Sequence, residues 1–96
     1  MSERLDFLRA NSSVINEIAA RHKALSIAVF GSVARGEESP ESDFDFLVTF
    51  NQGASLTDLA GLHDELAEYL NAPVDVVSTG GLKARHHQIL EEALIL

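Results

Sequence analysis

The most constraining feature of the chain is an apolar strand that ends in a glycine–serine turn, followed by a second strand that starts with two acids. Residues 25–30 are mostly apolar and run into Gly31 and Ser32, as a buried strand does where it meets a turn. Asp43 and Asp45 then stand two positions apart, and apolar residues alternate with them through position 50. Side chains two apart on a strand share a face, so the apolar face is expected to pack on helices and leave both carboxylates in a cleft.

The turn after the first strand has the chemistry of an anion-binding site. If a short helix starts at Ser32, its unpaired backbone N–H groups and the positive end of its dipole face the turn. Gly31 lets a phosphate approach the backbone because it has no Cβ, and the Ser32 hydroxyl is one more donor. Arg35 can add a charge-assisted contact. The sequence therefore predicts a phosphate-binding turn next to paired acids.

A third acid, Asp75, lies in the short apolar segment 73–78, where a carboxylate is out of place without a partner. Two like charges about 4 Å apart repel by about 1 kcal/mol in water and by about 4 kcal/mol at an intermediate dielectric. Mg²⁺ would turn that repulsion into attraction, and two ions about 3.5–4 Å apart can hold the attacking and leaving oxygens of a phosphoryl group. Asp43, Asp45 and Asp75 are therefore the predicted catalytic residues and ligands of Mg²⁺, with two ions expected.

Helices are predicted on both sides of these strands. Segment 3–22 predicts a helix that residues 11–13 can interrupt, and Ser55 is placed to cap another helix that stops at 71–73. The apolar stripe of this second helix consists of Leu59, Leu62, Leu66 and Leu70. The helix would connect strand 44–50 to strand 74–77 in a β-α-β unit.

If those two strands are parallel, the crossover should be right-handed and should bring Asp75 beside the other two acids. A last helix is expected over 82–94, and its apolar tail 93–96 either completes the core or docks a partner. These elements predict a small α/β (α+β) domain, a β-sheet flanked by helices. The chain has 96 residues, so we expect one domain over 1–96.

Composition narrows the classes of function. The net charge is −8, and the stretch from Gly36 to Gly80 contains ten acids with no Lys or Arg. Such a surface would repel a nucleic-acid backbone, so a basic protein is the more natural partner. The chain has no cysteine, no secretory leader and no apolar run of membrane-spanning length, so we expect a cytoplasmic protein without disulfides. His63, His86 and His87 lack the spacing of a zinc site.

Two motifs, GSVARG at 31–36 and SDFD at 42–45, resemble those of the minimal nucleotidyltransferases of the DNA polymerase beta superfamily. The resemblance covers about residues 25–77, and it implies a polymerase beta palm-like fold with a mixed sheet. It also implies roles by position. Gly31 and Ser32 would bind the nucleoside triphosphate, Asp43 and Asp45 would bind Mg²⁺, and Asp75 would help to bind metal and activate an acceptor hydroxyl. Arg35 and Ser42 would lie near the phosphates.

The first functional hypothesis is an enzyme that transfers a nucleoside monophosphate from ATP, or another triphosphate, to a hydroxyl group. A domain this small has little surface with which to grip an acceptor, so another protein must bring it. The resemblance implies that this partner is a small helical HEPN RNase toxin, that a tyrosine of the toxin is adenylylated, and that the chain is its antitoxin.

The alternative is a non-catalytic acidic module that neutralises a basic partner by covering its active site. An antibiotic nucleotidyltransferase would need an acceptor-binding surface that only a dimer could supply. Homo- and hetero-oligomers both remain open.

Overall fold

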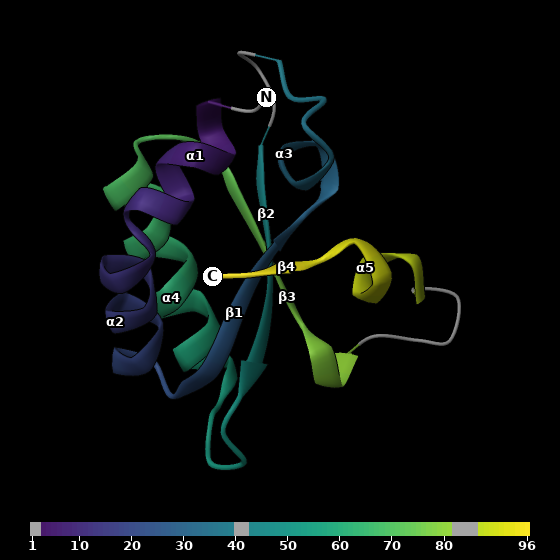
Figure 1. Cartoon of the computed structure of the whole chain (residues 1–96). Coiled ribbons are helices and arrows are strands. Elements are labelled where there is room, and N and C mark those ends of the chain that lie inside the picture. Colours follow the sequence, from purple (N-terminus) through teal and green to yellow (C-terminus); the bar gives the residue numbers. More distant parts are fainter. Residues whose placement is uncertain (1–2, 40–42, 82–86) are drawn as a thin grey trace.

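The described residues form a four-stranded mixed β-sheet (Figure 1). The glycine–serine turn and the predicted acids lie on or beside its strands. The computed structural model describes residues 3–39, 43–81 and 87–96. The strand order is β3-β2-β1-β4, in which β1 (Ala24–Phe30) pairs antiparallel with β2 (Phe44–Phe50). β2 pairs parallel with β3 (Val74–Ser78), which confirms the parallel arrangement on which the predicted β-α-β unit depended.

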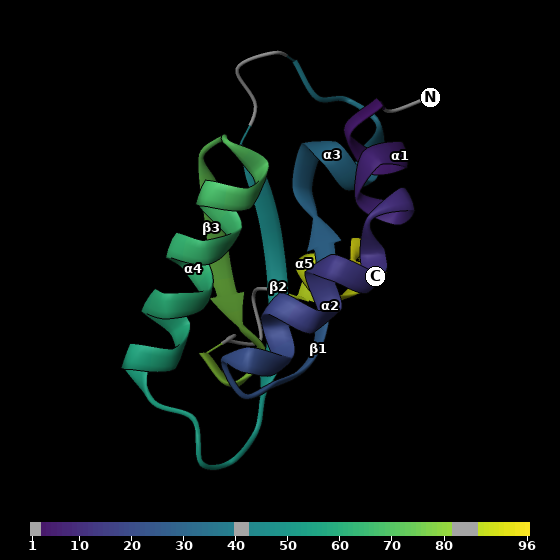
Figure 2. The ribbon, with the colours of Figure 1, turned by 90° about the vertical axis from the view of Figure 1, so that its left-hand side faces the viewer.

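Three helices cover one face of the sheet: α1 (Glu3–Ala10), α2 (Ser12–Arg21) and α4 (Leu56–Leu70) (Figure 2). The predicted interruption of the first helix is confirmed at Asn11, whose side-chain Nδ2 donates to the Phe7 carbonyl at 2.8 Å. The main core lies between these helices and the sheet. Its largest fully buried side chains include Phe46, Leu8, Ile15, Ile27, Leu62 and Leu66.

α4 starts and ends where the sequence predicts. The backbone N–H of Ser55 donates to the Asp58 carboxylate at 2.9 Å, which satisfies a polar group at the start of the helix. Asn71 adopts a left-handed conformation, with φ of 50°, and ends it. Because α4 crosses from β2 to β3, its length and its packed stripe determine where β3 meets β2. None of the described helices is long and apolar enough to cross a membrane.

The opposite face of the sheet carries a smaller cluster and α5 (His87–Glu92). Ala28, Phe30 and Leu47 are buried there, and Ile89 and Ala93 pack against them. Two short elements flank this face, α3 (Gly31–Arg35) after β1 and η1 (Thr79–Gly81) after β3.

The predicted helix over 82–94 is wrong in its last residues, and residues 82–86 lie outside the described part of the chain. α5 ends at Glu92, and β4 (Leu94–Ile95) pairs antiparallel with β1. The backbone groups on the free side of β1 need partners, and this segment supplies them, since the Leu96 N–H also donates to the Ile27 carbonyl at 3.0 Å. Leu94 and Leu96 pack on the main core, so the tail completes the core.

Shortening a core side chain of α4 should destabilise the fold. Leu66 is fully buried in the main core, so Leu66→Ala should lower the free energy of unfolding by about 2–5 kcal/mol through lost burial and a cavity. The matched control is Leu56→Ala in the same helix, because Leu56 is 84% exposed. Urea denaturation of both variants measures the difference. Equal losses for the two variants would contradict this description of the core.

Candidate active site

The alternation of β2 separates its apolar residues from its acids. Phe44 and Phe46 are buried in the main core under the helices, so Asp45 between them projects from the opposite face. Asp45 and Asp75 are register partners in the parallel pair β2–β3, and neighbouring strands lie about 4.8 Å apart. Asp43 directly precedes β2. The fold thus brings the three predicted acids to one face and one end of the sheet.

Asp45 lies in the most unfavourable electrostatic setting of the three acids. It is half-buried, whereas Asp43 and Asp75 are exposed. Partial burial raises the pKa of Asp45 above its ordinary value, the negative charges of Asp75 and Asp43 raise it further, and Arg35 opposes them. Among the described residues, the site therefore holds more negative charge than Arg35 offsets, which is the setting in which a bound cation is favourable.

The glycine–serine turn packs directly against Asp45. β1 ends at Phe30, and Gly31 opens α3 with a φ of 73°, a conformation that costs other residues free energy. A Cβ on Gly31 would overlap the Oδ2 atom of Asp45, so a larger residue would have to displace the Asp45 side chain. Ser32 follows as the second residue of α3, and the residue before the helix, Phe30, gives its first turn no side-chain cap. The predicted phosphate turn and one predicted metal ligand are in contact.

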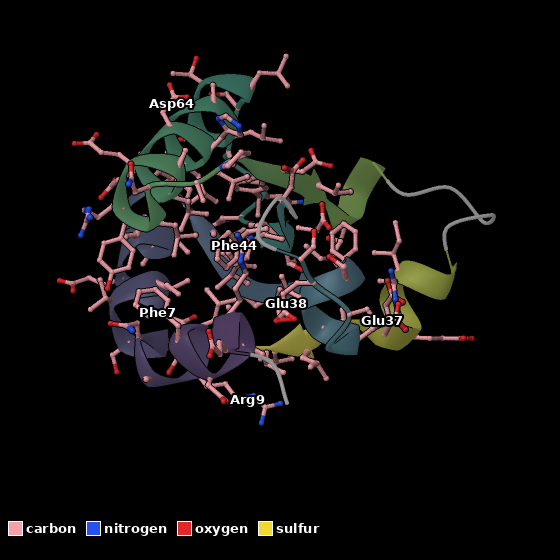
Figure 3. All side chains as sticks on the ribbon, turned by 90° about the horizontal axis from the view of Figure 1, so that it is seen from above. Phe7, Arg9, Glu37, Glu38, Phe44 and Asp64 are labelled. Carbon is pink, nitrogen blue, oxygen red and sulfur yellow. The ribbon has the colours of Figure 1, made fainter. Side chains whose placement is uncertain are left out.

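Arg35 lies at the same turn and is held by two carboxylates. Its Nη1 donates to both oxygens of Glu92, at 3.1 and 3.0 Å, and its Nε donates to Glu37 at 3.2 Å. The N–H of Gly31 donates to Glu92 as well, at 3.0 Å. Viewed from above, Glu37 lies beside α5, on the opposite side of the molecule from Phe7 (Figure 3).

Glu92 is the site residue that the sequence analysis missed. It stands 57 positions from Arg35, in an acidic pair with Glu91, and no motif sets it apart from a solvated helix residue. Only the packing of α5 on the sheet brings it to the turn. Ser42, a predicted nucleotide contact, lies outside the described residues, and so do Lys83, Arg85 and His86.

The acids fit Mg²⁺ in the way that this ion usually binds. Within residues 3–39, 43–81 and 87–96, no three His, Cys, Asp or Glu side chains are close enough to form a ready-made metal cluster. Mg²⁺ commonly uses one or two carboxylates and completes its shell with waters and substrate phosphates. Asp45 with its two acidic neighbours, beside the predicted phosphate turn, provides that donor set. His63 has a structural contact instead, since its Nε2 lies 3.0 Å from the Val74 carbonyl.

Comparison with known proteins identifies the family. Residues 12–96 match the family model described as "Nucleotidyltransferase domain". A Methanocaldococcus jannaschii protein, provisionally named a protein adenylyltransferase, is 36% identical over 96 residues, which cover 99% of this chain and 95% of the relative.

Two solved structures are similar as well. One, described as a provisionally assigned minimal nucleotidyltransferase, has a TM-score of 0.85 and 44% identity and covers 100% of this chain and 97% of that chain. The other is a tri-AMPylated Shewanella oneidensis HEPN toxin in complex with an MNT antitoxin. The matched chain has a TM-score of 0.67 and 20% identity over 91% of this chain and 69% of that chain, so it shows the shared fold. The fold thus occurs in known proteins, and the chain belongs to the nucleotidyltransferase domain family as a minimal nucleotidyltransferase.

Proposed function

We propose that the protein transfers AMP from ATP to a hydroxyl group of a partner protein in a Mg²⁺-dependent reaction. The observation that carries the proposal is the contact between Gly31 and Asp45, with Asp75 in register beside Asp45. A turn suited to phosphate and two carboxylates suited to a cation meet at one point, as nucleotidyl transfer requires.

The chain's own groups have separate roles in this proposal. Asp43 and Asp45 hold Mg²⁺, with Asp75 as a further ligand, and the bound ion would offset the charge of the phosphates. Ser32 and the N–H groups of α3 that follow Gly31 bind the triphosphate, since the Gly31 N–H itself donates to Glu92. Gly31 lets the phosphates approach the turn, and Arg35 lies nearby. Ser42 is proposed as a further phosphate contact from its place in the motif.

The transfer step forms one bond and breaks another. The acceptor oxygen attacks the α-phosphorus, the bond from that phosphorus to the bridging oxygen breaks, and pyrophosphate leaves. Asp75 accepts the hydroxyl proton and, because it is exposed, can release it to solvent. Asp43 is exposed too, so a bulky acceptor carried by a protein can reach this end of the sheet.

The acceptor we propose is a tyrosine of a HEPN-type RNase toxin, which makes this chain an antitoxin. Two observations support a protein partner. The 45 residues from Gly36 to Gly80 carry acids without a single Lys or Arg, which suits a basic surface. The Shewanella oneidensis complex with the same fold pairs an MNT antitoxin with an AMPylated HEPN toxin. We propose that residues 1–96 act here as one domain.

The first prediction concerns Asp43, whose charge should be needed for transfer. A lost metal ligand removes several kcal/mol of charge stabilisation, so Asp43→Asn should slow transfer by at least about a hundredfold. The measurement is the mass of the HEPN partner after incubation with ATP and Mg²⁺. Asp64→Asn is the matched control, because the Asp64 side chain is 82% exposed on α4. A wild-type chain that binds the partner but leaves its mass unchanged would instead support neutralisation by occlusion.

The second prediction concerns Asp45 and pH. Its raised pKa means that the folded protein keeps a proton which the unfolded chain loses, so stability falls as the pH rises from about 3.8 through the raised value. Asp45→Asn should remove this loss and increase the free energy of unfolding near neutral pH by up to about 1 kcal/mol. It should also abolish stabilisation by Mg²⁺ with ATP. Urea denaturation from about pH 3.8 to neutral pH, with and without Mg²⁺ and ATP, tests both effects. A lower stability of Asp45→Asn than of the wild type at neutral pH would contradict the charge balance described.

The third prediction separates overlap with Asp45 from backbone strain. Gly31 and Gly36 have φ values of 73° and 72°, but only a Cβ at Gly31 meets Asp45, whereas one at Gly36 meets nothing within 4 Å. Gly31→Ala and Gly36→Ala should each cost about 1–2 kcal/mol of stability from the positive φ. Only Gly31→Ala should also lose the thermal shift caused by ATP and Mg²⁺. Loss of that shift in both variants would show that the Asp45 contact is not the cause.

A further inference from the structure

Glu92 binds two of the groups that we propose lie at the triphosphate. Its Oε1 accepts the Gly31 N–H at 3.0 Å, and both of its carboxylate oxygens accept from Arg35 Nη1, at 3.1 and 3.0 Å. The Glu92 side chain is 18% exposed and the Arg35 side chain 43%, so the contact with Gly31 is partly shielded from water and the ion pair with Arg35 is partly exposed. The ion pair is strengthened by its two charge-assisted hydrogen bonds. One carboxylate thus joins α5 to the turn and to the arginine.

The position of Glu92 is fixed from both sides along the chain. Before it, Ile89 packs on the cluster of Ala28, Phe30 and Leu47, and Ala93 after it packs on the same cluster. Two residues on, Leu94 pairs with Val29 in the sheet. A carboxylate held by core packing and by sheet pairing is suited to orienting another group. The backbone that carries the carboxylate is therefore held in place against the sheet.

Arg35 depends on Glu92 for its direction. Its other carboxylate partner, Glu37, stands only two residues further along the chain, and the Glu37 side chain is 66% exposed. An exposed ion pair of this kind holds a long side chain weakly. Without Glu92, the guanidinium would therefore be free to turn to solvent, and the Gly31 N–H would lose its acceptor. The Gly31 turn would then lose the fixed positive charge of Arg35.

We propose that Glu92 is a positioning residue for nucleotide binding. It holds the Arg35 guanidinium toward the phosphates and fixes the Gly31 turn against Asp45. This inference rests on the proposed function, because it takes the turn at Gly31 as the triphosphate site. The C-terminal elements α5 and β4 accordingly form part of the nucleotide site, and Glu92 acts through Arg35 without touching the reacting atoms.

The test is a double-mutant cycle on ATP affinity. Glu92→Gln keeps an acceptor for the Gly31 N–H but removes the charge that binds Arg35, so it should weaken ATP binding in Mg²⁺ about tenfold, the value of one charge-assisted hydrogen bond. Arg35→Gln should weaken it by a similar factor. Adding Glu92→Gln to Arg35→Gln should then change the affinity less than twofold. Isothermal titration gives the affinities, and Glu91→Gln, on the same helix and exposed, is the matched control.

Kinetics supply a readout that a purely structural role would not move. Glu92→Gln should raise KM for ATP and leave kcat for AMP transfer within about twofold, because it removes binding shared by ground and transition states. Thermal unfolding without nucleotide shows that each variant is folded. Should Glu92→Gln fail to fold, Arg35→Gln alone decides, since unchanged ATP affinity in that variant overturns the proposal.

The remaining outcomes are also decisive. Tighter ATP binding by Glu92→Gln would show that Glu92 competes with the phosphates, and equal effects with and without Arg35 would show that it does not act through the arginine. Either result overturns this inference alone, provided that the wild-type chain binds ATP and Asp45→Asn does not. A wild-type chain that neither binds ATP nor transfers AMP would overturn the proposed function, and this inference with it.

Discussion

The two-residue alternation of β2 is the constraint on which the rest of the molecule depends. Phe44 and Phe46 must enter the core beneath α1, α2 and α4, and this requirement alone turns Asp45 to the opposite face. A shift of one residue in the strand would bury the acid and expose both rings. The hydrophobic effect, which is not directional, therefore fixes the direction of the most perturbed carboxylate in the site.

Charge is the unfavourable part of this arrangement. The negative charges of Asp75, Asp43 and Glu92 repel that of Asp45. Arg35 attracts Asp45, but it also forms ion pairs with Glu92 and Glu37. Close like charges reduce the stability of the ligand-free fold. A cation that occupies the site relieves the same repulsion, so the features that destabilise the empty site are those that favour Mg²⁺. Stability and function are in opposition at Asp45.

The parts of the fold predictable from sequence are those governed by neighbours along the chain. The strands at β1 and β2, the break at Asn11 and the capped start of α4 each follow from a local pattern of apolar, turn or capping residues. β4 was missed because Leu94 and Ile95 continue a helical pattern. They form a strand because the backbone groups on one side of β1 need hydrogen-bond partners, which the sequence pattern does not reveal. Glu92 was missed for a similar reason, since its role exists only after α5 packs on the sheet. For the site, the motif predicted the candidate residues, whereas the partners of Arg35 could come only from the tertiary structure.

β3 is an outer strand of the described sheet, paired on one side with β2 alone, whereas β2 is paired on both sides. Strands at an edge open more readily in local unfolding than central ones do. Asp75 lies on β3, while Asp43, Asp45 and the turn lie on or beside the two central strands. Local opening of β3 would release Asp75 and keep the turn with its two nearest acids. With the roles proposed above, a molecule opened at β3 would still capture nucleotide but could no longer activate an acceptor, so the two halves of the reaction would be separated by the loss of one strand.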